Sequence, residues 1–223
     1  MIVQIYSLMN ADEAVACAQA GADHVGVLVS RTIDHRYPCE VLPEEGKKIF
    51  AALKGKAKRV LICVEPDQES VLKMTEELRP DILHLCADFH GSFAFRKILR
   101  QRCPEIELME AVGVRDESAI AQALVKAKYA DYLILDTMPS DNPGIGAAGT
   151  THDWNIDRKI IEQVHIPVIE AGGLGVDNIQ EVIRQLHPWG VDSCTRTSIK
   201  KDGIIIGKDL EKVRIFCTLA KAI

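Results

Sequence analysis

The chain has 223 residues, of which 47% are hydrophobic and 26% charged, a balance that excludes a disordered tail, a collagen-like repeat and a disulfide-stabilised mini-protein. Its 27 Lys and Arg against 32 Asp and Glu leave a net charge of -5, so the basic surface of a nucleic-acid-binding protein is missing. Apolar runs fall short of the ~20 residues of a membrane helix, and seven scattered cysteines indicate a reducing compartment. We therefore expect a cytoplasmic protein without nucleic-acid or membrane partners.

Hydrophobic periodicity predicts eight short buried strands, each followed by a segment with helical spacing. The predicted strands are 2–6, 24–29, 59–64, 82–86, 106–112, 132–135, 167–171 and 190–194. The clearest helical segments are 11–20, 67–78, 117–126 and 177–186, with candidate N-caps at Asn10, Asp67, Asp116 and Asp177. Continuous apolar strands between helices are typical of a parallel sheet buried on both faces. Eight units of roughly 28 residues favour a single (β/α)₈ TIM barrel over 1–223, with an open sheet as the alternative.

Two segments near the end of the chain predict a phosphate site, because functional groups of such barrels lie at the carboxyl ends of the strands. Gly172 and Gly173 follow the seventh predicted strand, where paired glycines let backbone amides approach a phosphate. Segment 194–198, where the eighth predicted strand ends, adds Thr195 and Arg196, both competent phosphate ligands. The simpler alternatives are a tight turn and a solvated loop that continues into Lys200 and Lys201.

Asp136 ends the apolar run 132–135, where desolvation favours a neutral carboxyl group. A neutral carboxyl suits a general acid, although the residue could simply brace the next loop. That loop, 137–151, is long enough to close over a ligand. No lysine falls at the end of a predicted strand, which argues against a Schiff-base aldolase.

A metal site is the main alternative from the residues alone. Four residues alternate along one predicted face: His84, Cys86, Asp88 and His90. Four acids could line the same mouth and hold a divalent ion: Glu65, Glu110, Asp136 and Glu170. Four ligands on one strand span too great a length to meet one ion, and core packing explains His84 and Cys86. We therefore expect no metal.

Several motifs together resemble the phosphoribosylanthranilate isomerase family over essentially the whole chain, most strongly from Leu133 to Leu174. They are 10–14, 20–23, 133–137, 146–154, 167–174 with Asn178, 190–192 and 207–213. The resemblance implies a (β/α)₈ barrel of the ribulose-phosphate-binding type and no cofactor. It also implies an Amadori rearrangement in tryptophan biosynthesis that converts a phosphoribosylamine aldose into a 1-deoxyribulose ketose.

The resemblance assigns roles to matching positions. Asp136 corresponds to the general acid that protonates the ribose ring oxygen. Arg36 corresponds to the arginine that meets the anthranilate carboxylate. Gly172 and Gly173 correspond to the phosphate-binding glycines.

Other positions depart from the family. The family's Lys-Ile-Cys-Gly, whose cysteine is the general base, reads Gln4-Ile5-Tyr6-Ser7 here, and a phenol of ordinary pKa ~10 is a poor base. Gln-Leu-His-Gly becomes His84 to Ala87, and Ser-Ser-Gly becomes Cys194 to Arg196. Glu110 and Glu170 replace residues that are usually basic or apolar. Cys86 or Cys63 could supply a thiolate only with a different substrate pose.

The sequence therefore predicts a barrel protein, monomeric or homodimeric, that binds a phosphorylated sugar-type small molecule. It is either an aldose–ketose isomerase of the Amadori type or a diverged relative with an altered active site. The alternatives are a non-catalytic phosphate-ligand-binding protein and a metal-dependent lyase or epimerase that uses the acidic mouth. The predicted catalytic residues are Asp136 and Tyr6. The predicted substrate-binding residues are Arg36, Gly172, Gly173, Thr195, Arg196, His84 and Cys86.

Overall fold

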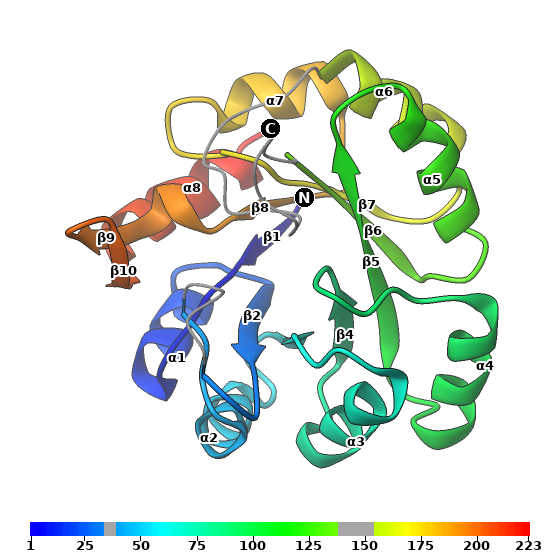
Figure 1. Cartoon of the computed structure of the whole chain (residues 1–223). Coiled ribbons are helices and arrows are strands. Elements are labelled where there is room, and N and C mark those ends of the chain that lie inside the picture. The colour runs from blue at the N-terminus through cyan, green and yellow to red at the C-terminus, as the bar shows by residue number, and fades with distance from the viewer. Residues whose placement is uncertain (34–38, 138–153) are drawn as a thin grey trace.

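A closed barrel forms the centre of the computed structural model, which describes residues 1–33, 39–137 and 154–223. Within these ranges eight parallel strands pair in chain order, and β8 pairs with β1 to close the barrel (Figure 1). The strands are β1 (Ile2–Ile5), β2 (His24–Val29), β3 (Lys58–Cys63), β4 (Ile82–Leu85), β5 (Glu107–Val114), β6 (Tyr132–Thr137), β7 (Val168–Glu170) and β8 (Gly190–Ser193). The predicted (β/α)₈ barrel is confirmed, and the open sheet is excluded.

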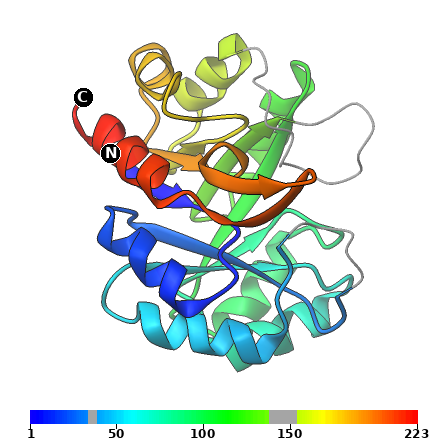
Figure 2. The same ribbon diagram turned by 90° about the vertical axis from the view of Figure 1, so that its left-hand side faces the viewer.

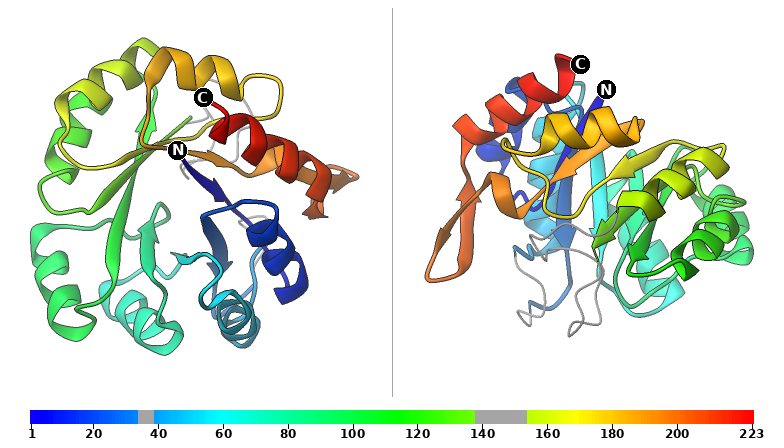
Figure 3. Two further views of the ribbon diagram at one scale, coloured as in Figure 1. Left: turned by 180° about the vertical axis from the view of Figure 1, so that it is seen from behind. Right: turned by 90° about the horizontal axis from the view of Figure 1, so that it is seen from above.

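A ring of helices surrounds the strands, as the views from behind and above show (Figure 3). The helices are α1 (Ala11–Gln19), α2 (Pro43–Leu53), α3 (Gln68–Leu78), α4 (Phe93–Arg102), α5 (Ser118–Lys126), α6 (Trp154–Gln163), α7 (Ile179–Leu186) and α8 (Leu210–Lys221). The last helix contacts the first, so α8 lies beside α1 where the ring closes (Figure 2). No helix in the described ranges is long and apolar enough to cross a membrane.

The strands separate two apolar cores because successive side chains of a strand point to opposite faces. On β6, Leu133 and Leu135 belong to the large core between strands and helices, whereas Ile134 belongs to the smaller core inside the barrel. Ile169 of β7 likewise points inward, and Val168 points outward. This alternation decides which polar side chains reach the barrel mouth.

The helix starts agree with the predicted caps in part. Asn10 caps α1 by accepting a hydrogen bond from the Glu13 amide, and Asp67 caps α3 in the same manner. Glu117 instead of Asp116 occupies the N-cap of α5. Asn178 instead of Asp177 precedes α7, because Asp177 pairs with Arg196. Two of the four predicted caps therefore lie one residue before the observed N-cap, although Asp116 still accepts a hydrogen bond from the Ser118 amide.

Residues 195–208 form structure that the sequence did not predict. A short 3₁₀ turn, η1 (Thr195–Thr197), leads into an antiparallel hairpin of β9 (Ser198–Lys201) and β10 (Ile204–Lys208). The hairpin extends beyond the ring of helices beside α8 (Figure 1). Lys200 and Lys201, interpreted as part of a solvated loop, lie in β9 instead. The predicted barrel pattern needs no strand here, which explains the omission.

Candidate active site

A polar pocket lies at the carboxyl ends of β6, β7 and β8. Its lining residues are Asp136, Gly172, Gly173, Leu174, Asp192, Ser193, Cys194, Thr195 and Arg196. Five of the predicted site residues therefore meet in one place: Asp136, Gly172, Gly173, Thr195 and Arg196. Strand order produces this result, since β6, β7 and β8 are neighbours in the barrel.

Gly172 allows the turn after β7 to pack directly against the end of β6. Gly172 and Gly173 have φ values of +82° and +68°, in the left-handed region that favours glycine. A Cβ atom on Gly172 would lie 2.4 Å from Thr137 Oγ1 and 3.3 Å from Asp136 Oδ1. A larger residue would therefore push the turn away from the predicted general acid.

The same turn offers backbone donors to the pocket. Within the described ranges, the N–H groups of Gly173 and Leu174 donate to no protein acceptor. Asn178 holds the turn open, because its Nδ2 donates to Gly173 O at 3.1 Å and its Oδ1 accepts from Gly175 N at 2.8 Å. Available amides in a glycine turn before a helix can bind an anion.

Arg196 braces this turn. Its Nη1 donates to Gly173 O at 3.0 Å, and its Nη2 lies 2.6 Å from Asp177 Oδ2. A Cβ on Gly175 would lie 3.1 Å from Arg196 Cβ, so glycine also makes room for the arginine. Arg196 thus fixes the shape of the pocket with part of its donors, and Thr195 begins η1 at the pocket wall.

Asp192 is a pocket residue to which the sequence analysis gave no role. Its exposed fraction is 5%, and its Oδ1 has no hydrogen-bond partner among the described residues. Burial, followed by the nearby charge of Asp136, raises the pKa of Asp192 well above its usual range. Both effects favour the neutral form of the Asp192 carboxyl group. Its position, two residues after Gly190 on β8, was the available signal.

Tyr6, by contrast, follows β1, packs in the inner core of the barrel and does not line this pocket. Its hydroxyl lies 2.7 Å from His84 Nδ1, and the two rings stack with centroids 5.4 Å apart. A Cβ on Gly26 would lie 2.0 Å from the Tyr6 ring, so the glycine on β2 provides space for it. Burial raises the pKa of Tyr6 well above 10 and lowers the pKa of His84 to about 3. Tyr6 is therefore no base at neutral pH.

The thiols considered as substitutes are also protonated. Burial raises the pKa of Cys63 and of Cys86 to about 12. Cys63 belongs to the outer core beneath the helices, whereas Cys86 packs against the inner core. Neither one lines the pocket that contains Asp136.

The prediction that four acids line the barrel mouth is wrong for Glu110 and Glu170, because both lie at outward-facing strand positions. Glu110 is fully buried and its Oε2 lies 3.4 Å from Lys126 Nζ of α5. Glu170 follows the inward-facing Ile169, and Asp157 of α6 contributes to its raised pKa after burial. In the part of the chain that the structure describes, no three His, Cys, Asp or Glu residues are grouped to hold a metal ion.

Two predicted features fall outside the described residues. They are Arg36, in the segment 34–38, and nearly all of the loop 137–151.

A carboxyl group on β6, a glycine turn after β7 and a polar turn after β8 define the class of this protein. It is a (β/α)₈ barrel with its pocket at the strand ends where barrels of this fold carry out their chemistry. A family profile described as N-(5′-phosphoribosyl)anthranilate (PRA) isomerase matches residues 4–218. The chain therefore belongs to the phosphoribosylanthranilate isomerase family, as the sequence motifs predicted.

Individual relatives agree with this assignment. The chain is 31% identical to the N-(5′-phosphoribosyl)anthranilate isomerase of Methanocella arvoryzae, over 96% of this chain and 98% of the relative. It is 32% identical to the Haloferax volcanii enzyme of the same name, over 98% and 92%. A crystal structure of phosphoribosyl anthranilate isomerase in complex with reduced 1-(o-carboxyphenylamino)-1-deoxyribulose 5-phosphate has the same fold. Its TM-score is 0.78 at 21% identity, with both chains covered completely.

Proposed function

We propose that the protein isomerises N-(5′-phosphoribosyl)anthranilate to the corresponding 1-deoxyribulose 5-phosphate ketose. The observation that carries the proposal is the pocket that Asp136 shares with the glycine turn at Gly172 and Gly173. The names of the relatives support this substrate. So does the ligand in the structure of similar fold, whose name describes a reduced form of the ketose.

In this proposal the phosphate binds between the turns after β7 and β8. The N–H groups of Gly173 and Leu174 would donate to it from one side, and Thr195 would donate its hydroxyl from the other. Arg196 holds the glycine turn in place and adds a positive charge beside it. The raised pKa of Asp192 favours the same arrangement, since a carboxylate at that point would repel a phosphate.

Asp136 would act as the general acid at the ribose ring. Its carboxyl proton moves to the ring oxygen, the C1–O bond breaks, and the nitrogen lone pair forms a C1=N iminium. A base then removes the C2 proton, and the C2–H electrons give an enolamine. Loss of the C2 hydroxyl proton to the Asp136 carboxylate and protonation of C1 complete the ketose. Substrate and product are isomers, so the sequence needs no cofactor.

The remaining predicted residues take binding or packing roles. We assign Arg36 to the anthranilate carboxylate on the ground of the family resemblance. Tyr6, His84 and Cys86 form the wall that closes the barrel interior, and their protonation states suit packing beneath the substrate better than proton transfer.

A second candidate is a phosphate-ligand-binding protein without turnover. One observation favours it: Tyr6, buried and protonated, occupies the position at which the family has its base. Such a protein would bind the substrate and leave it unchanged.

A fluorescence assay of phosphoribosylanthranilate consumption separates the two candidates. We expect measurable turnover by the wild type and a loss of about 10²- to 10⁴-fold in kcat for Asp136→Asn, the usual contribution of a general acid. Asp202→Asn is the control, because Asp202 lies in the β9–β10 turn at φ +52°, a conformation that Asn tolerates. Binding of the reduced ketose analogue without turnover by the wild type would establish the second candidate.

A further inference from the structure

The proposed isomerisation needs a base for the C2 proton, and the end of β8 supplies a candidate thiol. Cys194 lines the pocket with Asp136. Ile5 and Ser193 are register partners of the β1–β8 pair, so Cys194 lies next to Tyr6, one strand away from the position that the family uses. Its Sγ is 3.1 Å from Ser7 Oγ. From this arrangement we infer that Cys194 is the general base of the reaction, an inference that rests on the proposed function.

The other cysteines are unsuitable for this role. Three of them are buried beneath the helices: Cys17, Cys103 and Cys217. Cys63 and Cys86 are protonated, as described above. Burial also raises the pKa of Cys39 to about 11, and Cys39 does not line the pocket.

A buried cation accompanies Cys194. Lys208 of β10 is 3% exposed, and its Nζ donates to Cys194 O at 2.9 Å and to Ser198 Oγ at 2.8 Å. Neither acceptor is a carboxylate, so the ammonium charge remains available to nearby groups. A positive charge beside a cysteine stabilises its thiolate. The Ser7 hydroxyl can donate to the same sulfur.

Three acidic side chains, Asp192, Glu13 and Asp136, and the Cys39 thiol lie near Cys194 or Lys208. Burial raises the pKa of Asp192, two residues away along the chain, and favours its neutral form. The Glu13 carboxylate of α1 accepts the backbone N–H of Lys208 and does not line the pocket. Asp136 is the remaining acid of the pocket and gives up its proton to the substrate in the step before the thiolate acts.

The proton transfers balance with these two groups. The Cys194 thiolate takes the C2 proton of the iminium and becomes a thiol, while the C2–H electrons neutralise the nitrogen. The thiol returns a proton to C1 of the enolamine as the Asp136 carboxylate takes the C2 hydroxyl proton. Both side chains end in their initial protonation states.

Two substitutions and one reagent test the inference. We expect Cys194→Ser and Cys194→Ala to lower kcat on phosphoribosylanthranilate by at least about 100-fold, with KM and the affinity for the reduced ketose analogue within about threefold. The acid limb of the wild-type kcat–pH profile should be lost in both variants. Cys103→Ser, which removes a thiol at the end of α4 that does not line the pocket, should retain wild-type kcat.

Iodoacetamide provides a readout that needs no variant. Alkylation of Cys194 should abolish wild-type turnover. The reduced ketose analogue, bound in the pocket, should slow the alkylation. Full activity after stoichiometric labelling of Cys194, or a kcat of Cys194→Ser within about threefold of the wild type, overturns the inference and leaves the proposed function intact. Absence of turnover by the wild type refutes the proposed function, and the assignment of Cys194 as its base is then refuted as well.

Discussion

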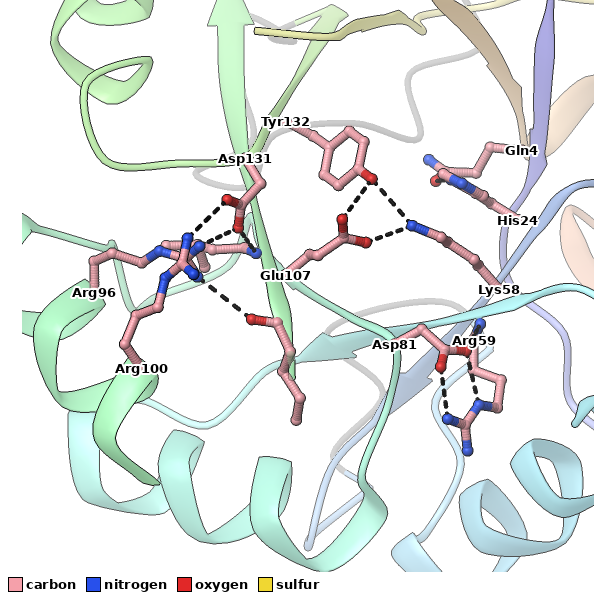
Figure 4. A network of polar contacts seen from close by, with 12 residues as sticks. Gln4, His24, Lys58, Arg59, Asp81, Arg96, Arg100, Glu107, Asp131 and Tyr132 are labelled. Atoms are coloured by element: carbon pink, nitrogen blue, oxygen red, sulfur yellow. Dashed lines mark hydrogen bonds and ion pairs between the residues drawn. The ribbon is translucent and has the colours of Figure 1, made fainter. Parts of the chain in front are cut away.

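The two ends of the barrel differ in whether their polar groups have hydrogen-bond partners. At the N-terminal end, Lys58 Nζ of β3, Glu107 of β5 and the Tyr132 hydroxyl of β6 form hydrogen bonds with one another (Figure 4). At the carboxyl end, Asp192 Oδ1 and the Gly173 amide have no partner among the described residues. Buried polar groups without partners destabilise a fold. The unpaired groups that line the pocket therefore indicate where a ligand binds, whereas the paired side chains at the N-terminal end stabilise the barrel.

The same aspartate contact occurs three times at the N-terminal end of the barrel. An aspartate precedes each of β2, β4 and β6, and its carboxylate accepts the N–H of a residue on the preceding strand. These contacts are Asp23 to Val3 at 2.9 Å, Asp81 to Arg59 at 2.8 Å and Asp131 to Leu108 at 2.7 Å. In return, the backbone N–H of each aspartate donates to the backbone carbonyl of its partner on the preceding strand. Each carboxylate also meets a cation. Mutations at this end should alter stability without altering turnover.

The largest effect is expected for Gly172→Ala at the carboxyl end. The new Cβ would collide with Thr137 Oγ1 and move the end of β6 that carries Asp136, and displacement of an acid by ~1 Å lowers turnover by about 100-fold. Gly203→Ala is the matched control, since Gly203 has the same φ of +82° and open space around it. We expect it to destabilise the protein by about 1 kcal/mol and to leave kcat unchanged. Equal kcat for both variants would contradict the proposed geometry.

At the N-terminal end, Arg96→Met should lower the free energy of unfolding by about 3 kcal/mol, because it removes a largely buried cation from Asp131. The Arg96 side chain is 10% exposed. Arg100 contacts the same aspartate at 3.4 Å but is 58% exposed, so Arg100→Met should cost less than about 1 kcal/mol. Urea unfolding measures both values, and kcat should stay constant in both. A fall in kcat with Arg96→Met would show that the two ends are coupled.

The smallest expected effect is the pH dependence of the stability that the Arg59–Asp81 ion pair contributes. Burial raises the pKa of Asp81, but hydrogen bonds from the Arg59 side chain and backbone outweigh burial and lower it. A lowered folded-state pKa stabilises the protein above the unfolded pKa of ~3.9, and this stabilisation is lost as the pH falls through the folded pKa.

Arg59→Met should therefore destabilise the protein by about 1 kcal/mol at pH 7, and the difference should shrink below pH ~4. Urea unfolding of both proteins between pH 3 and 7 measures it. Arg214→Met, in an exposed helix pair with Glu211, serves as the control at pH 7. A difference that grows in acid would contradict the assignment to Asp81.

The sequence predicted the site where strand order alone brings residues together. Asp136, Gly172 and Thr195 follow three consecutive strands, so any closed parallel barrel places them side by side. It did not predict the orientation of Glu110 and Glu170, because strands that are apolar on both faces carry no alternation to show which positions face inward. The sequence did not indicate Cys194 as a candidate base, because the neighbouring Lys208 belongs to a hairpin that was not predicted.

The sequence by itself determined the eight strand–helix units, the family and the strand that carries each motif, because periodicity and motifs are local properties of the chain. The tertiary structure decided which side chains share the pocket and which are protonated. Gly26 makes room for Tyr6, Arg196 reaches back to the turn after β7, and Lys208 is buried beside Cys194. Each of these three arrangements depends on a contact between residues that are distant in the chain. The burial and charge that result from such contacts determine the chemistry of the side chains.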